Sequence, residues 1–127
     1  MGYAHLTNHY HKIQQLRNAM GILEWDQATM MPSGGAEGRT EQMAVLGSML
    51  HEMNTDPRIG DWLGTASEED LSEWSRANLR EIARKYRHET ALTGDLVEAM
   101  TRATMKCEFV WRTARADNDF AAVKPLL

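Results

Sequence analysis

The chain has 127 residues, of which 43% are hydrophobic and 25% charged, a composition typical of a globular protein with one sizeable core. Its net charge of −4 lacks the basic excess that neutralises phosphates, which argues against a general nucleic-acid binder. The single cysteine, Cys107, excludes an internal disulfide and a cysteine-rich zinc site. No segment has the pattern of a secretory signal or a membrane span, so we expect a cytoplasmic protein without membrane attachment.

The first predicted element is a long helix over about residues 4–29. Apolar side chains recur there in steps of three or four, which places them on one face of a helix. These residues are Tyr3, Leu6, Tyr10, Ile13, Leu16, Met20 and Leu23. Gly21 lies inside this helix at a cost of roughly 1 kcal/mol relative to Ala. We interpret it as a point of close approach by a neighbouring backbone, in preference to a tolerated defect.

A turn and a second helix follow. Pro32 disfavours helical geometry at Met31, and Gly34 and Gly35 provide the turn. The second helix is expected to begin at residue 35 or 36 and to end at residues 54–57, where Pro57 stops it and opens a new helical turn. Its inward face is expected to consist of Met43, Leu46, Leu50 and Met53.

A short helical piece over residues 58–63 is expected to close the end of the bundle, before a break at residues 64–66. Ser67 is the expected N-cap of a third helix reaching about residue 92, because three acidic residues follow it in the first turn. The residues expected to face inward here are Ile59, Trp62 and Leu63, and then Leu71, Trp74, Asn78 or Leu79, Ile82 and Tyr86.

A fourth helix is predicted to begin after residue 94 and to end near residue 117. Its inward face is expected to comprise Leu96, Met100, Ala103, Cys107, Val110 or Trp111, and Ala114. Residues 120–127 have the pattern of the first turns of another element. No strand-like alternation of useful length occurs. We therefore predict an all-α fold, a single helical domain over residues 1–127 built as a bundle of long antiparallel helices with short connecting helical turns.

Zinc peptidase chemistry of the His-Glu-x-x-His type needs two histidines one helical turn apart, with a glutamate beside the first. The chain contains only near misses: Thr55 and Leu92 occupy the second histidine position after His51 and His88, and Leu6 replaces the glutamate after His5. We expect the cluster of His5, His9 and His11 to lie on a solvated face. No metal ligand is therefore predicted in this chain.

Three further features have ordinary structural explanations. Cys107 is expected to be a buried, inert thiol. The basic flank of the third helix is interleaved with glutamates, and Glu81 is one turn before Lys85, so we expect a solvated, salt-bridged face. The nine methionines fit core filling, and a groove for partner helices is the alternative.

Asp26 precedes the turn at residues 30–35, at the negative end of the first helix dipole, where a carboxylate is unfavourable. Such a carboxylate is stabilised only if a cation compensates it. Arg39, one turn into the second helix, is the nearest candidate. We predict that Asp26 and Arg39 approach each other across the turn.

The run LEWDQATMMPSGGAEGRTEQ from Leu23 to Gln42 resembles the N-terminal region of the carboxypeptidase Taq family of zinc metallocarboxypeptidases. The segment WRTARADNDF from Trp111 to Phe120 is similar to the same family, so the resemblance covers nearly the whole chain. The motif positions to which we assign a structural role are Trp25, Asp26, Gln27, Met31, Pro32, Gly34, Gly35, Arg39 and Gln42.

The resemblance implies an N-terminal fragment of a much longer all-helical peptidase, which forms part of the wall or cover of a substrate groove. Family members remove C-terminal residues from peptides with zinc or another divalent metal and are usually dimeric. Their metal motif lies downstream, so we expect this chain to be inactive alone, to contain no cofactor and to self-associate or form a homodimer. The alternative is a non-catalytic helical adaptor or regulatory domain derived from that fold.

Overall fold

The computed structural model describes residues 1–127 and consists of helices joined by short turns. Its elements are α1 (Gly2–Thr29), η1 (Ser33–Gly35), α2 (Ala36–Asn54), α3 (Arg58–Ser67), α4 (Glu73–Glu89), α5 (Gly94–Ala116), α6 (Phe120–Val123) and η2 (Lys124–Leu126). The prediction of an all-α fold is confirmed. None of these helices combines the length and the apolar character needed to cross a membrane.

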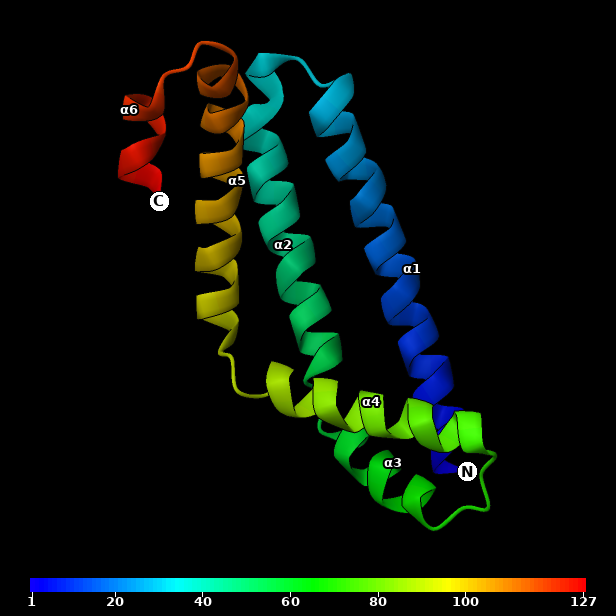
Figure 1. The fold of residues 1–127 in the computed structure, drawn as a ribbon. Helices are drawn as coiled ribbons and strands as arrows, with labels where there is room; N and C mark the ends of the chain where they lie inside the picture. The colour runs from blue at the N-terminus through cyan, green and yellow to red at the C-terminus, as the bar shows by residue number, and fades with distance from the viewer.

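The helix α2 lies between the two other long helices. It runs antiparallel to α1 and to α5 and packs against both, while α3 and α4 lie across the lower end of the molecule (Figure 1). The short helix α6 folds back beside the upper part of α5 (Figure 1). The result is an open arrangement in which α1 and α5 are both supported by α2.

The core is small and lies at the lower end. Leu6 of α1, Ile59 and Ala66 of α3 and Ile82 of α4 form one buried cluster. Partly buried side chains surround it, namely Tyr3, Tyr10, Trp62, Leu63, Leu79 and Tyr86. This arrangement confirms that the short helical piece closes the end of the bundle. It also confirms the inward face of the first helix, where Leu6 and Ile13 are fully buried.

The predicted break at residues 64–66 and the predicted N-cap at Ser67 are wrong. The helix α3 continues through this stretch to Ser67, because Ala66 is buried in the core and the Ser67 hydroxyl donates to the Gly64 carbonyl at 2.6 Å. The N-cap of the next helix is Ser72, whose Oγ accepts a hydrogen bond from the Ser75 amide at 3.2 Å. Burial of Ala66 thus overrides the local capping pattern.

Two predicted inward faces also need correction. Trp74 is 87% exposed, and α4 faces the core with Leu79, Ile82 and Tyr86. On α5, Met100 is 55% exposed and Leu96 is 45% exposed, whereas Met105 is buried. The reason is that α5 turns Thr101 toward α2. A methyl group added to Gly47 would lie 3.3 Å from the Thr101 hydroxyl.

The close approach expected at Gly21 is found at Gly2 instead. A Cβ atom built on Gly21 has no neighbour within 4 Å, so this glycine is a tolerated defect. A Cβ atom on Gly2 would lie 2.4 Å from the Trp62 carbonyl oxygen and 2.7 Å from the Ala66 amide nitrogen. Only glycine at position 2 therefore lets the start of α1 cross α3 this closely.

Candidate functional site

The turn between α1 and α2 is fastened by Arg39. Its Nη2 donates to Asp26 Oδ2 at 2.7 Å, its Nη1 to the Leu23 carbonyl at 2.5 Å and its Nε to Gln42 Oε1 at 3.2 Å. The Arg39 side chain is only 13% exposed. The predicted approach of Asp26 and Arg39 is confirmed, and all three types of guanidinium nitrogen have acceptors. We call these four residues the Arg39 clasp.

The remaining motif residues shape the turn itself. Pro32 adopts an extended conformation that separates α1 from η1. The Met31 side chain packs against Gly35, where an added Cβ atom would lie 3.1 Å from Met31 Cγ. Gly34 faces open space, and Trp25 is 61% exposed. The turn is therefore formed as expected, while the Trp25 ring is available for contact.

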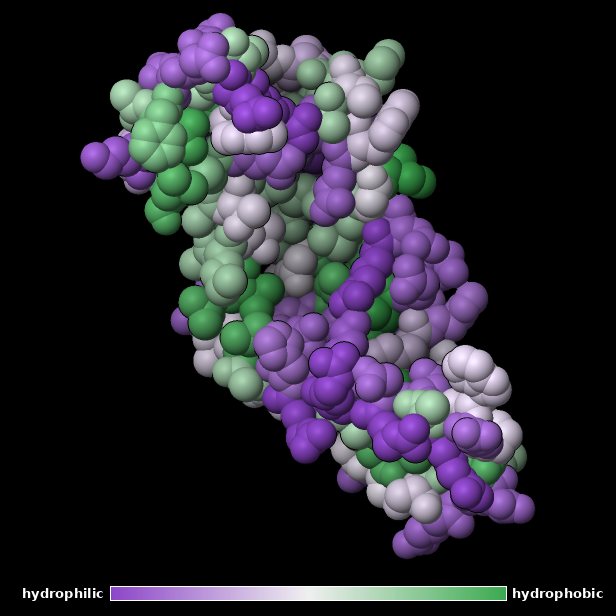
Figure 2. All heavy atoms as spheres, in the orientation of Figure 1, coloured by the Kyte–Doolittle hydropathy of each residue, from purple (hydrophilic) through white to green (hydrophobic).

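A groove of about 420 Å³ opens between α1 and α5, next to the Arg39 clasp. Met43 of α2 lies at its floor, Met20 and Gln27 line it from α1, and Met100 and Met105 line it from α5. The surface is hollowed between these two helices, with apolar atoms in the depth of the hollow (Figure 2). The groove therefore joins helices that are far apart in the sequence.

Carboxylates give this groove its charge. Glu24 from α1, Glu89 from the end of α4 and Glu108 from α5 line it, and no Lys, Arg or His side chain does. Glu108 is paired with Arg112 at 2.5 Å, whereas Glu24 is in none of the ion pairs of the structure. The groove thus combines a methionine-rich floor with a negative rim.

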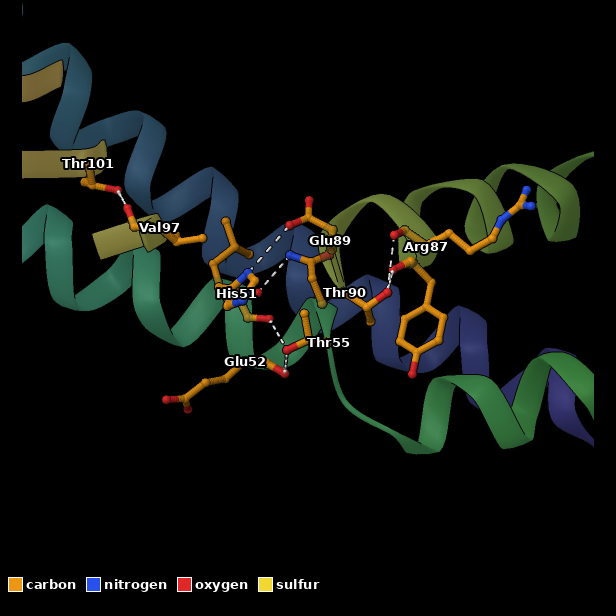
Figure 3. Close-up of polar contacts among 11 residues, drawn as sticks. His51, Glu52, Thr55, Arg87, Glu89, Thr90, Val97 and Thr101 are labelled. Carbon is orange, nitrogen blue, oxygen red and sulfur yellow. Dashed lines mark hydrogen bonds and ion pairs between the residues drawn. The ribbon is translucent and has the colours of Figure 1, made fainter. Parts of the chain in front are cut away.

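A buried histidine adjoins one end of the groove. His51 of α2 is 7% exposed and its Nδ1 has no hydrogen-bond partner, although Glu89 Oε2 lies 3.8 Å away. The two side chains point toward each other from α2 and α4, whereas Glu52 points away (Figure 3). Burial raises the pKa of the nearby Tyr10 hydroxyl, and the charge of Glu89 raises it further. Burial also lowers the pKa of Lys85, with a smaller effect from Arg17.

The histidines singled out in the sequence do not come together as metal ligands. His9 Nε2 lies 2.7 Å from the Met53 carbonyl, and the rings of His5 and His9 contact Trp62 at centroid distances of 5.6 and 5.5 Å. No group of three or more His, Cys, Asp or Glu side chains is arranged to hold a metal ion. The pair of His51 and Glu89 alone offers too few donors.

The other singled-out residues are placed as follows. Cys107 is half-buried, not buried as expected, and lines a shallow cavity beside the C-terminal residues. The basic flank of α4 is exposed and salt-bridged, which confirms the expectation of a solvated face. The partner of Glu81 is Arg84 at 2.7 Å, not Lys85 as expected. These residues form no second site.

Sequence reasoning did not identify His51, Glu89 and Glu108 as neighbours of one groove. One signal was present, because Met43, Gly47, His51 and Asn54 recur in steps of three or four and place His51 on the buried face of α2. Nothing comparable connects Glu89 with Glu108, since they meet only through the packing of α4 and α5 around α2.

Comparison with known proteins places this fold in a family. The family model described as carboxypeptidase Taq (M32) metallopeptidase matches residues 5–127. Thermostable carboxypeptidase 1 of Thermus thermophilus is 33% identical over 98% of this chain, which spans 25% of that relative's length. Carboxypeptidase 1 of Bacillus subtilis is 23% identical over 91% of this chain and 24% of its own length.

Solved structures show the same arrangement of helices. The crystal structure of BsuCP matches 98% of this chain with a TM-score of 0.92 at 20% identity, and 26% of that chain is covered. The metallocarboxypeptidase 1 of Trypanosoma cruzi matches 98% of this chain with a TM-score of 0.75 at 35% identity, and 25% of that chain is covered. The chain thus spans about a quarter of these relatives and belongs to the carboxypeptidase Taq (M32) metallopeptidase family.

Proposed function

We propose that this chain is the N-terminal helical region of a metal-dependent carboxypeptidase and forms part of the wall or cover of its peptide groove. The observation that carries this proposal is the family match over residues 5–127, together with a chain that spans only a quarter of its relatives. The complete enzyme acts on peptides with zinc or another divalent metal. It is cytoplasmic and forms a homodimer.

The donor groups of this chain do not fit the metal. His51 and Glu89 offer two donors 3.8 Å apart, and no third His, Cys, Asp or Glu joins them. The metal ligands and the general base therefore come from other parts of the enzyme. What this chain supplies is shape, because its long helices form part of the wall and the Arg39 clasp fastens α1 to α2.

A chimera tests this proposal. Residues 1–127 replace the matching quarter of the Thermus thermophilus relative, and release of C-terminal residues from a model peptide is measured with and without metal. We expect metal-dependent activity from the chimera and none from the 127-residue chain alone. Turnover of the peptide by the isolated chain contradicts the proposal, as does a folded, metal-loaded chimera without activity.

The alternative function is a non-catalytic helical adaptor, which an exposed apolar face favours. Trp111, Phe120 and Leu127 are 46%, 65% and 84% exposed near α6, on the side where apolar atoms gather in Figure 2. Such a patch on an isolated chain is a contact surface for another protein. A reading frame that continues into a His-Glu-x-x-His helix rules this alternative out.

The large accessible surface of the whole chain leads us to propose that the isolated chain self-associates. Its accessible surface is 8555 Å². A compact monomer of 14.4 kDa exposes about 6,800 Å², which leaves an excess of roughly 1,700 Å². This excess is about twice what one partner contributes to a standard protein interface. Light scattering that finds only monomers at high concentration contradicts self-association.

A further inference from the structure

We propose that the groove between α1 and α5 is the seat of one more helix, an amphipathic helix with apolar side chains along its centre and Lys or Arg at its flanks. The inference rests on the proposed function, because this helix comes from the remaining part of the same peptidase. It assigns an occupant to a surface that the 127 residues leave open.

The geometry is that of a helical bundle with one place empty. The helices α1 and α5 each pack against α2, and the groove lies between them above Met43. The lining residues recur at helical spacing on both walls, as Met20, Glu24 and Gln27 on α1 and as Val97, Thr101, Thr104 and Glu108 on α5. Parallel ridges with this spacing accept the side chains of another helix.

The helical walls of the groove favour a helix over an extended segment as its occupant. An extended peptide binds by adding its backbone to a sheet edge, and its affinity comes from main-chain hydrogen bonds. Here both walls are α-helices, whose backbone groups are already bonded within the helix. A helix brings its own backbone bonds and needs only side-chain contacts. Methionine side chains, which adapt their shape, suit such a contact.

The charge of the rim determines the partner's flanks. Glu24, Glu89 and Glu108 line the groove and no basic residue does, although Arg112, outside the lining, pairs with Glu108. Basic side chains on the partner compensate these carboxylates, whereas acidic ones are repelled. A second copy of this chain, with a net charge of −4 and the same acidic rim, is the less complementary occupant.

Two designed peptides test the proposal on the 127-residue chain. Both are about 20 residues long, enough to form a helix, and carry the same central leucines, one with flanking lysines and the other with flanking glutamates. We expect the lysine peptide to bind about tenfold more tightly at low salt, the effect of two or three partly exposed ion pairs. The double substitution Glu24→Gln and Glu108→Gln should reduce this preference to about twofold. The charge-matched control, Glu52→Gln with Glu68→Gln, should leave it unchanged.

Methionine methyl NMR locates the bound peptide. We expect shifts at Met20, Met43, Met100 and Met105, which line the groove, and none at Met49 or the other methionines outside it. Equal binding of the two peptides, shifts confined to methionines outside the groove, or a bound peptide that is not helical each overturns the proposal. Concentration-dependent shifts of the groove methyl groups without peptide overturn it too, because a second copy then fills the groove.

The outcome is separable from that of the proposed function. An active chimera combined with no binding of the lysine peptide refutes the helix seat and leaves the peptidase role standing. An inactive chimera combined with specific peptide binding refutes the peptidase role and leaves the seat.

Discussion

Replacing Arg39 by methionine is expected to destabilise the chain by about 2 kcal/mol. The substitution keeps the apolar stem and removes the donors to Asp26, Leu23 and Gln42. Exposed ion pairs contribute about 0.2–1 kcal/mol, and breaking a fully buried pair costs about 3–5 kcal/mol. Arg39 is 13% exposed and Asp26 is 35% exposed, which places the loss between these ranges.

The assay is urea unfolding followed by tryptophan fluorescence, with a surface ion pair as the control. Arg84 contacts Glu81 at the same distance of 2.7 Å, but these side chains are 74% and 65% exposed. We expect Arg84→Met to cost less than about 0.5 kcal/mol. A double-mutant cycle of Arg39→Met with Asp26→Asn should give a coupling of about 1 kcal/mol. Equal losses for the two arginine variants, or no coupling to Asp26, refute the reasoning.

Three further changes have definite expected outcomes. Gly21→Ala should stabilise the chain by about 0.5–1 kcal/mol in thermal unfolding, because its Cβ atom meets nothing within 4 Å; a loss of stability contradicts this. Gly2→Ala should destabilise it by about 1–3 kcal/mol in the same assay, because the Trp62 carbonyl must move; a gain contradicts the close crossing. The hydrogen bond from Arg58 lowers the pKa of Asp56 below its ordinary value of 3.8. The ionised carboxylate therefore stabilises the fold above pH 3.8, and this stabilisation is lost as the pH falls through the lowered pKa. The urea midpoint should therefore fall more between pH 5 and pH 2 in the natural chain than in Asp56→Asn, and equal decreases contradict this.

The sequence predictions were correct where residues close together in the sequence determine the structure. The inward face of α1 and the turn at Pro32 were predicted because a long apolar period and a proline act locally. The contact between Asp26 and Arg39 was predicted because a carboxylate and a guanidinium group flank one short turn. These features can be predicted without knowing how the remaining helices pack.

The predictions that were wrong concern features that tertiary contacts decide. Ser67 and Ser72 are both plausible caps, and burial of Ala66 against the core selects the second. The rotation of α5 turns Thr101 toward Gly47, and these residues are more than fifty positions apart in the sequence. The groove could not be predicted from the sequence either, because its lining includes residues from four helices, α1, α2, α4 and α5.

The position of α1 has a mechanical consequence. The helix is attached through buried Leu6 and Ile13 below and through the Arg39 clasp above, whereas only Met20 is half-buried within residues 18–22. Gly21 lies in this stretch, and a Cβ atom added to it would have no neighbour within 4 Å. We expect a bend in this stretch to change the distance between α1 and α5 while Leu6, Ile13 and the Arg39 clasp stay in place. The width of the groove then depends on the stiffness of α1, and alanine at position 21 should increase that stiffness.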